Sequence, residues 1–486
     1  MARFNKVLLI NLAYPSTKFT MPVIPVGIGY IAEFLKKNGI RYFIFDMTLG
    51  HNGAELRKRI RKERPDIIGI SMMSFMYNRH YSLISSLKRD FPDIPILVGG
   101  PHISTMKSKA LEECPAIDYG IMQEGEVPAL SLCLGDELSR IPSLIYRDSG
   151  KIIVNSVLPN QEAGLDMLPF PRYEGFELGK YGYGICIVSS RGCPYACIYC
   201  MASVTRRKFR ARGAVHIADE IEHWYKRGYR EFDMQEDNPT FNRVRIFELC
   251  DEIERRGLKD LVIMCGNGVR ADKVDREILK RMKEVGFKRL GFGVEAGNNK
   301  VLESIKKGET IEVISKAVQE ACELGFFVSI FFIVGSPTET PDDFQDSVNI
   351  ALSYPISHVN FFNLIPLPST ELYDWVKDNG YFLVEPEVYL NAGSSVQMSC
   401  NPVFETPYFN KRERIKALKK GKSIERFVKR RTIAKTFHKI RPFNHLVAWL
   451  YMMPVVQEIE NQMLRSLLYR RIMDKIRNKV RMLFYK

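Results

Sequence analysis

The first 135 residues alternate short apolar runs with amphipathic stretches. Runs typical of buried strands occupy Lys6–Leu12, Arg41–Asp46, Ile67–Ser71, Ile94–Gly99 and Asp118–Met122. Apolar residues recur at helical spacing between them, as in Val26–Asn38 and Glu55–Glu63. This alternation predicts a doubly wound, Rossmann-like parallel α/β sheet, whose ligands bind beyond the carboxyl ends of the strands. The loops expected there are Ala13–Pro25, Ser71–Phe75, Gly99–His102 and Glu124–Glu126.

A second alternating series runs from residue 181 to residue 375. Its expected strands are Gly184–Ser189, Glu231–Gln235, Leu261–Gly266, Arg289–Gly293, Phe326–Val334 and His358–Leu364. Its expected helices are Ala214–Arg227, Arg243–Arg256, Arg276–Val285, Thr310–Leu324 and Pro341–Tyr354. Six βα units predict a full or partial (β/α)6 barrel, in which catalytic residues follow the strands.

The remaining segments are less regular. Residues 136–180 are rich in Pro and Gly, which predicts a short hairpin, Ser143–Arg147 with Ile152–Val154, and a linker. Residues 407–486 are typical of basic helices around the apolar stretch Leu446–Val456. We therefore expect a Rossmann-like domain at 1–135, a hairpin and linker at 136–180, a barrel at 181–375 and a basic, largely helical region at 376–486.

The net charge of +15 belongs to the C-terminal region. Residues 407–486 hold 22 Lys and Arg against 5 Asp and Glu, a net charge of +17. Residues 1–406 hold 49 against 51, a net charge of −2. The pattern excludes a chain that binds nucleic acid through a basic surface over its whole length.

Three features predict a reducing, cytoplasmic location. Met1–Lys6 leads directly into a strand-like run, without the charged and apolar regions of a signal peptide. No apolar run reaches the roughly 18–20 residues that a membrane-spanning helix needs. The ten cysteines are scattered apart from one tight group, and such a group indicates metal binding before disulfides in a reducing compartment.

The tight group lies in the segment Arg191-Gly-Cys-Pro-Tyr-Ala-Cys-Ile-Tyr-Cys200. Its CxxxCxxC spacing differs from the bacterial ferredoxin run, and a zinc site would usually need a fourth ligand. Cys193, Cys197 and Cys200 can instead hold three irons of a [4Fe–4S] cube and leave the fourth iron open. The alternative is a set of three unpaired structural cysteines.

With Tyr199 before the last cysteine, and with its position after the first barrel strand, this segment resembles the radical S-adenosylmethionine (radical SAM) superfamily. The resemblance implies that SAM binds the open iron. An electron then cleaves SAM to methionine and a 5′-deoxyadenosyl radical, which abstracts a hydrogen atom from a substrate carbon. An external electron donor of the flavodoxin or ferredoxin type is implied as well.

Other residues match the strand ends at which this superfamily binds SAM. Glu236 and Asp237 end the second barrel strand, where a carboxylate can pair with the SAM ammonium group. Arg270 follows the third strand, and Glu295 ends the fourth, where it can accept from ribose hydroxyls. Gly335 ends the fifth, where backbone can approach the adenine. The alternative for each charged residue is a solvated or ion-paired loop position.

The N-terminal sheet has no GxGxxG after its first strand, which argues against a dinucleotide. Pro25–Gly29, Gly69–Ser71, Val98–His102 and Gly120–Glu126 resemble the cobalamin-binding domain that precedes the barrel in one large radical SAM family. The resemblance implies cobalamin contacts at Ser71, Ser74, Gly99, Gly100, His102, Glu124, Gly125 and Glu126.

The loop after the first strand departs from that family's wider pattern. Other cobalamin domains carry DxHxxG, whose His coordinates cobalt, whereas Asn11–Thr17 contains no His. The resemblance therefore implies no strong lower ligand from the protein, and His102 is expected to hydrogen-bond a corrin amide or the nucleotide tail. The alternatives are that His102 caps a turn and that the domain has lost cobalamin.

The two resemblances imply a cobalamin-dependent radical SAM enzyme. The commonest chemistry by resemblance is methyl transfer from methylcobalamin to an unactivated carbon of a small or lipid-like substrate, with a second SAM that re-methylates the cobalt. The main alternative is cyclisation, oxidation or carbon–carbon coupling without methyl transfer. The cobalamin-like domain argues against an RNA methylthiotransferase, and the intact cysteine motif argues against a non-catalytic cobalamin-binding protein.

The basic C-terminal region is compatible with three interpretations. It can form a helical cap on the barrel with a solvated basic face. It can bind an anionic surface at the inner membrane face, because Leu446–Val456 carries interfacial aromatic residues between basic segments. It can bind RNA, although no recognition module accompanies the charge.

Overall fold

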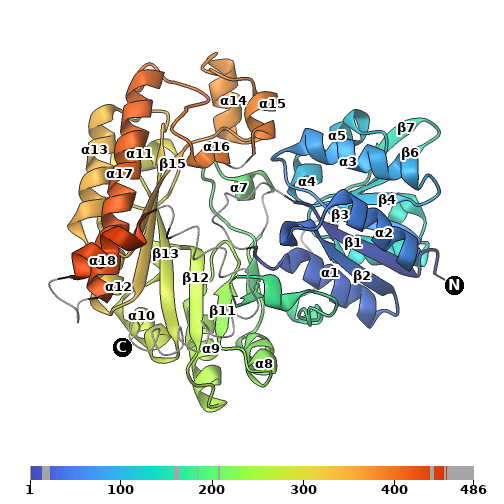
Figure 1. Cartoon of the computed structure of the whole chain (residues 1–486), viewed down its shortest axis with the longest axis horizontal. Helices are drawn as coiled ribbons and strands as arrows, with labels where there is room; N and C mark the ends of the chain where they lie inside the picture. Colours follow the sequence, from blue (N-terminus) through green and yellow to red (C-terminus); the bar gives the residue numbers. More distant parts are fainter. Residues whose placement is uncertain are drawn as a thin grey trace. The chain divides into compact units, whose positions relative to one another are not determined.

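The computed structural model describes residues 2–13, 22–157, 164–182, 184–205, 208–393, 395–437, 443–453 and 456. The chain forms two compact units (Figure 1). Unit 1 comprises Met1–Ser16, Pro22–Gly182 and Glu385–Ser394, and unit 2 comprises Thr17–Met21, Tyr183–Val384 and Ser395–Lys486.

Unit 1 is built on a seven-stranded sheet in the order β2-β1-β3-β4-β5-β6-β7. Its parallel strands are β1 (Lys6–Asn11), β2 (Arg41–Asp46), β3 (Ile67–Ser71), β4 (Ile96–Gly99) and β5 (Tyr119–Ile121). The centres of β1, β3 and β4 are continuous buried apolar runs, as expected for strands that are covered on both faces. The chain order reverses between β1 and β3, and doubly wound sheets bind their ligands at such a point.

The helices of unit 1 begin and end at local signals that the sequence carries. They are α1 (Val26–Lys37), α2 (Gly53–Glu63), α3 (Tyr77–Asp90), α4 (Pro101–Met106), α5 (Ser108–Glu113) and α6 (Glu126–Leu134). The side chain of Asn52 accepts from the N–H groups of Ala54 and Glu55, and the Glu55 carboxylate accepts from the N–H of Asn52. This capping box fixes the start of α2. The parallel strand order, with helices between successive strands, confirms the predicted doubly wound sheet.

Two segments outside the first 135 residues complete unit 1. The hairpin of β6 (Leu144–Asp148) and β7 (Lys151–Val154) adds two antiparallel strands next to β5. Helix α15 (Pro386–Asn391), which follows the barrel in sequence, packs on α3 and accepts the N–H of Met76 at Leu390 O, 2.8 Å away. The sequence predicts the hairpin but places both segments outside the first domain.

Unit 2 is built on a six-stranded sheet in the order β15-β14-β13-β12-β11-β8. All its pairs are parallel, and its strands are β8 (Ile185–Ile187), β11 (Glu231–Met234), β12 (Val262–Val269), β13 (Phe287–Glu295), β14 (Phe327–Val334) and β15 (His358–Asn363). Among the described residues, β8 and β15 are the two edge strands, so the sheet does not close. The barrel is therefore partial, which is one of the two forms that the sequence predicts.

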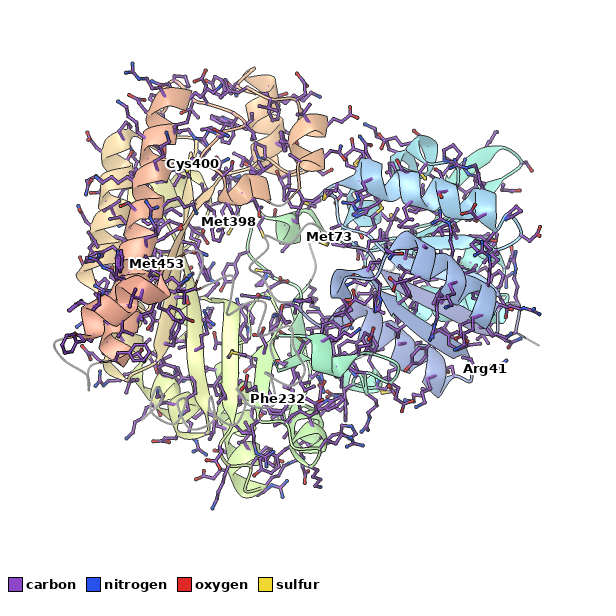
Figure 2. All side chains as sticks on the ribbon, in the orientation of Figure 1. Arg41, Met73, Phe232, Met398, Cys400 and Met453 are labelled. Atoms are coloured by element: carbon purple, nitrogen blue, oxygen red, sulfur yellow. The ribbon has the colours of Figure 1, made fainter. Side chains whose placement is uncertain are left out.

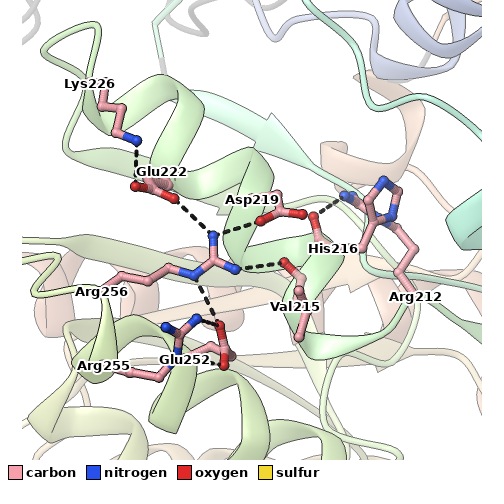
Figure 3. A network of polar contacts seen from close by, with 9 residues as sticks. All are labelled: Arg212, Val215, His216, Asp219, Glu222, Lys226, Glu252, Arg255 and Arg256. Carbon is pink, nitrogen blue, oxygen red and sulfur yellow. Dashed lines mark hydrogen bonds and ion pairs between the residues drawn. The ribbon is translucent and has the colours of Figure 1, made fainter.

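Helices form the outer layer of this sheet (Figure 1). They are α8 (Ala214–Tyr225), α9 (Arg243–Arg255), α10 (Arg276–Glu284), α11 (Asn299–Ser304), α12 (Ile311–Glu323) and α13 (Pro341–Ser353). Phe232 of β11, which is labelled in Figure 2, has no exposed surface. On the outside, Arg256 pairs with carboxylates of α8 and α9, Asp219, Glu222 and Glu252 (Figure 3).

The long helix α17 (Lys411–Thr436) runs along the open edge of the partial barrel (Figure 1). Its side chains bind backbone groups that β15 leaves without a strand partner: Glu425 accepts from the N–H of Phe361 at 2.7 Å, and Lys422 donates to Phe361 O at 3.3 Å. Arg431 donates to the carbonyls just before β15, Tyr354 O and Ile356 O, each at 3.0 Å. Helix α17 thereby covers an edge that would otherwise be exposed for pairing.

The rest of the C-terminal part contains α14 (Glu371–Asp378), α16 (Ser395–Met398) and α18 (Asn444–Tyr451). The predicted apolar stretch Leu446–Val456 lies inside the described residues except for Pro454 and Val455. Within the described ranges, every helix is too short or too polar to cross a bilayer.

Candidate functional site

The cysteine motif forms a loop at the carboxyl end of the partial barrel, which we call the cluster loop (192–200). It follows β8 and the short strand β9 (Ser190–Arg191), which pairs with β10 (Arg210–Ala211). Two backbone bonds anchor its centre: the N–H of Ile198 donates to Ile305 O at 3.2 Å, and Ile198 O accepts from Leu372 N–H at 3.0 Å. The loop is thereby tied to the end of α11 and the start of α14.

The thiols of Cys193, Cys197 and Cys200 are half-buried on this loop. Burial, together with the neighbouring thiols of Cys197 and Cys193, raises the pKa of Cys200 to about 11. The described residues contain no three Cys, His, Asp or Glu side chains that already form a metal-binding group. The thiols would therefore have to turn toward a common centre, but three soft donors on one anchored, accessible loop are the right ligands for an open-iron cube.

Arg270 holds the first half of the cluster loop. Its guanidinium carbon lies 3.4 Å from the centre of the Tyr195 ring, a cation–π contact. It also donates to Lys307 O at 3.0 Å, to Gly308 O at 3.1 Å and to Asp272 at 2.9 Å. These contacts occupy the guanidinium with protein groups, which favours a positioning role over direct SAM binding.

Glu295 holds the second half of the loop from the end of β13. It adopts a left-handed φ of 66°, a strained conformation for a non-glycine residue. Its side chain is hydrogen-bonded to Tyr199, and burial together with this carboxylate raises the pKa of Tyr199 well above its usual value. Lys307 Nζ lies 3.1 Å from Glu295 Oε1 and 3.5 Å from Glu309 Oε2.

Lys307 and Glu309 are buried site residues that sequence reasoning missed. Burial lowers the pKa of Lys307, but the charges of Glu295 and Glu309 outweigh this and raise it overall. The ammonium group is therefore charged inside the protein. Lys307-Gly-Glu309 has no motif or periodicity of its own, and only its position between two strand ends could have identified it.

Glu236 and Asp237, which the sequence predicts together as SAM-binding carboxylates, differ in their burial and contacts. Glu236 is buried and accepts from the N–H of Ser189 at 3.2 Å, from Ser189 Oγ at 2.5 Å and from Ser190 Oγ. Arg245 donates to Ser189 O at 2.7 Å from the other side. Asp237 is exposed, and its charge raises the pKa of Cys193 and Cys200. Of the two carboxylates, Asp237 is thus the exposed one and Glu236 the buried one.

Gly335 lies at the end of β14 with a left-handed φ of 109°. A Cβ atom there would overlap the guanidinium of Arg414, which α17 inserts between the ends of β14 and β15. Arg414 donates to Val334 O at 3.0 Å and to Phe404 O, and its charge is fully buried. The N–H groups of Gly335 and Ser336 donate to Glu339 Oε2. Arg414 is therefore a buried cation of α17 and does not belong to a solvated face of that helix.

In unit 1, the loops after β3 and β4 meet at the expected carboxyl edge. Met72 N–H donates to Gly99 O at 3.0 Å, and His102 N–H donates to Met72 O at 3.1 Å. Gly100 has a left-handed φ of 95°, and a Cβ there would lie 2.8 Å from Met72 O. The glycine thus admits the protein's own backbone, which accounts for it without a corrin contact.

His102 is buried, and both its ring nitrogens have protein partners. Nε2 lies 2.6 Å from the Tyr81 hydroxyl, and Nδ1 lies 3.3 Å from Ser74 Oγ. Burial lowers the pKa of His102 to about 4, so the ring is neutral. These contacts order the loop that follows β3, which includes the exposed Met73 (Figure 2).

The loop after β5 completes this edge. The N–H of Gln123 donates to Ser104 Oγ of α4 at 2.8 Å, which links the loop to the one after β4. Glu124 and Gly125 precede α6, and Glu126, its first residue, is buried. The predicted cobalamin contacts after β3, β4 and β5 are therefore brought together. The loop after β1 lies largely outside the described residues.

Comparison with known proteins finds a family match in each of the two units. Residues 187–351 match the radical SAM superfamily, and residues 16–132 match the B12 binding domain. An uncharacterised methyltransferase of Pyrococcus horikoshii, PH0819, is 27% identical over 423 residues, which cover 81% of this chain and 90% of that protein. The anaerobic magnesium-protoporphyrin IX monomethyl ester cyclase of Rubrivivax gelatinosus is 27% identical over 375 residues, 73% of this chain and 66% of the cyclase.

Among solved structures, the radical SAM methyltransferase TsrM of Kitasatospora setae has the same fold. Its TM-score is 0.68 at 19% identity, over 78% of this chain and 77% of TsrM. TsrM has been solved with cobalamin and a [4Fe–4S] cluster bound. In this chain the B12 binding domain precedes the radical SAM domain, in the order that the sequence predicts. The chain therefore belongs to the cobalamin-binding radical SAM enzymes, whose cofactors are a [4Fe–4S] cluster, SAM and cobalamin.

Proposed function

We propose that this enzyme transfers a methyl group from cobalamin to an unactivated carbon of a small molecule. The observation that carries the proposal is the order of the two domains, with the B12 binding domain ahead of the radical SAM domain. In addition, the chain is 27% identical to the methyltransferase PH0819 over 90% of that protein's length. When bound, the cluster and SAM supply a radical that abstracts hydrogen, and methylcobalamin supplies the methyl group.

The residues of unit 2 take distinct roles in this proposal. Cys193, Cys197 and Cys200 hold the cluster, and the exposed carboxylate of Asp237 binds the SAM ammonium group by a charge-assisted hydrogen bond. Gly335, whose Cβ side is filled by Arg414, would offer the adenine only its backbone at the end of β14. Glu236, Arg270 and Glu295 act as positioning residues, because their polar atoms are engaged with the loop and strand ends.

In unit 1, the loops after β3, β4 and β5 hold cobalamin at the carboxyl edge of the sheet. Ser71, Ser74 and Glu124 offer polar side chains there, and His102 orders Ser74. His102 acts through Ser74 and Tyr81 rather than on cobalt, because both its ring nitrogens already have partners.

A second candidate is cyclisation or oxidation of the substrate without methyl transfer. The similarity to the cyclase of Rubrivivax gelatinosus, over 73% of this chain, favours it. The two candidates share hydrogen abstraction and differ in the fate of the substrate radical. Only the first consumes a second SAM as methyl donor.

The deciding experiment uses the reconstituted full-length enzyme under anaerobic conditions, with cobalamin, a reductant and SAM whose methyl group carries three deuterium atoms. Small molecules extracted from the host serve as substrates, and mass spectrometry detects products. Methyl transfer predicts deuterium-labelled product, with both 5′-deoxyadenosine and S-adenosylhomocysteine formed. Substrate-dependent 5′-deoxyadenosine without label or S-adenosylhomocysteine would establish the second candidate instead.

A further inference from the structure

Helix α17 has one face that the barrel does not use. Ten of its positions are exposed, and eight of these are cations: Lys411, Arg412, Lys416, Lys419, Lys420, Arg426, Arg430 and Lys435. The other two are Ser423 and Phe427. Spacings of three and four residues place them along one side of a helix that is about 39 Å long. We call these ten exposed residues the basic face.

Part of the charge of the basic face is not paired with an acidic side chain of the described residues. Glu413 caps the start of α17, and Glu425 binds Phe361 and Lys422, so the helix's two acids are engaged elsewhere. No carboxylate in the described part of the chain forms an ion pair with Lys416, Lys419 or Arg426. Such a stripe raises the local concentration of an anionic partner.

The basic face ends beside a cluster of exposed apolar side chains. Helix α18 packs on α17 through buried Asn444 and Ala448, and Asn444 Nδ2 donates to Ala434 O at 3.1 Å. Its other side exposes large apolar residues, with exposed fractions of 63% for Phe443, 52% for Leu446, 50% for Trp449 and 42% for Leu450. Large apolar residues gathered in this way mark interaction surfaces.

A cavity lies where the basic face of α17 meets α18. It has a volume of about 310 Å³ between α17 and α18 and is lined by Phe427, Arg430, Arg431, Ala434, Lys435, Asn444 and His445. Cationic and aromatic side chains thus surround a space that can admit an anionic headgroup, directly beside the apolar cluster.

We propose that the basic face and the apolar cluster of α18 dock on an anionic phospholipid surface. Cations attract the headgroups, and aromatic and aliphatic side chains enter the interface. A single-stranded RNA would also attract the cations and could stack on Trp449, but Leu446 and Leu450 offer no stacking surface. An acidic protein would not require this exposed hydrocarbon. The inference does not depend on the proposed reaction.

The test is sedimentation of the full-length protein with vesicles, made of phosphatidylcholine alone or mixed with phosphatidylglycerol. The protein is expected to sediment only with the anionic vesicles, more weakly at high salt. Reversing Lys416, Lys419 and Arg426 to Glu should weaken binding at low salt by about tenfold or more. Reversing Arg431 would be a poor choice, because it holds carbonyl groups before β15.

A matched control reverses Lys58, Arg61 and Lys62, three exposed cations of α2 in unit 1, and should leave vesicle binding unchanged. Trp449→Ser with Leu450→Ser should abolish the binding that survives high salt, without a change in melting temperature, because both side chains are exposed. Absence of binding to anionic vesicles at low salt would overturn the proposal. So would equal losses in the two charge-reversal variants, or binding to homopolymeric RNA but not to vesicles.

Discussion

The buried guanidinium of Arg414 lies against the backbone of Gly335, so that the C-terminal helix reaches the end of β14. Arg414 also contacts the Phe404 ring, with its guanidinium carbon 4.3 Å from the ring centre, and lies 3.3 Å from Asn363 Oδ1 of β15. The carboxyl ends of the last two strands are therefore shaped by a residue that lies outside the barrel sequence.

Gly335→Ala should be markedly destabilising. The new Cβ would meet Arg414 in a left-handed backbone, which combines overpacking with conformational strain and should cost about 3 kcal/mol of unfolding free energy. Gly380→Ala is the matched control, since Gly380 also has a left-handed φ, 66°, but has nothing within 4 Å of its Cβ position. It should cost about 1 kcal/mol. Urea denaturation measures both, and equal losses would refute the packing role of Arg414.

Glu339 should make stability depend on pH. Burial raises the pKa of Glu339 to about 7, although the N–H groups of Gly335 and Ser336 and the charge of Arg414 lower it. The unfolded chain loses this proton near 4.5 and the folded chain only near 7, so the contribution is complete below about pH 4.5 and is lost as the pH rises through 7. Its size is about 3 kcal/mol.

Glu339→Gln keeps an oxygen acceptor but cannot titrate. The unfolding free energy of the parent enzyme minus that of the variant should therefore fall between about pH 5 and about pH 8. Urea denaturation across this range gives the difference. A difference that is constant or rises with pH would contradict the buried, proton-binding carboxyl group.

Arg270→Lys should reduce iron binding more than it reduces stability. Lysine cannot stack its side chain flat on Tyr195 while donating to both Lys307 O and Gly308 O, so the cluster loop loses an anchor. Arg230 offers a matched control away from the loop, because it lies 3.6 Å from the Tyr225 ring centre and donates to Tyr225 O and Tyr229 O. Both variants should lose about 1–2 kcal/mol.

Iron and acid-labile sulfide per protein distinguish the two variants after anaerobic reconstitution. Arg270→Lys should contain less of both than the parent enzyme, whereas Arg230→Lys should match it. Equal iron content in both variants would remove Arg270 from its positioning role.

The strands of both sheets could be predicted closely because parallel strands are buried on both faces. Arg41–Asp46 and Ile67–Ser71 have the same bounds in the structure as in the prediction. The sequence predicts basic helices in residues 407–486 but not their bounds, and α17 continues through Gly421. This glycine does not break the helix but lets it approach β15, where a Cβ would lie 2.7 Å from Phe361 Cβ. That contact spans 60 residues and leaves no local signal.

The site shows the same division between local and distant information. Three cysteines on one loop form a motif, so their spacing alone indicates the chemistry. The buried partners of the loop form no such motif. The sequence predicts Glu236 as a SAM-binding carboxylate, whereas in the structure the hydroxyls of Ser189 and Ser190 donate hydrogen bonds to it. Lys307 and Arg414 look like ordinary surface cations until the fold buries them.

Bound cobalamin should show no histidine ligand from the protein. His102 contacts Tyr81 and Ser74 through its two ring nitrogens, and burial lowers its pKa to about 4, so it stays neutral and engaged at neutral pH. The electron paramagnetic resonance spectrum of bound cob(II)alamin should lack splitting from an imidazole nitrogen of the protein. Splitting that disappears in His102→Phe would contradict this.

This test needs the full chain. A fragment that ends at residue 135 lacks β6, the partner of β5, and lacks α15, whose Leu390 and Asn391 bind the start of α3. We expect such a fragment to bind cobalamin more weakly than the full chain.

The most direct test of the central claim is the amount of 5′-deoxyadenosine formed from SAM by the reconstituted, reduced enzyme. Cys197→Ala removes one of the three thiolates that an open-iron cube requires, whereas Cys250→Ala changes a buried thiol on α9. We expect the parent enzyme and Cys250→Ala to form 5′-deoxyadenosine and Cys197→Ala to form none. Formation of 5′-deoxyadenosine by Cys197→Ala would contradict the assignment of the cluster to Cys193, Cys197 and Cys200.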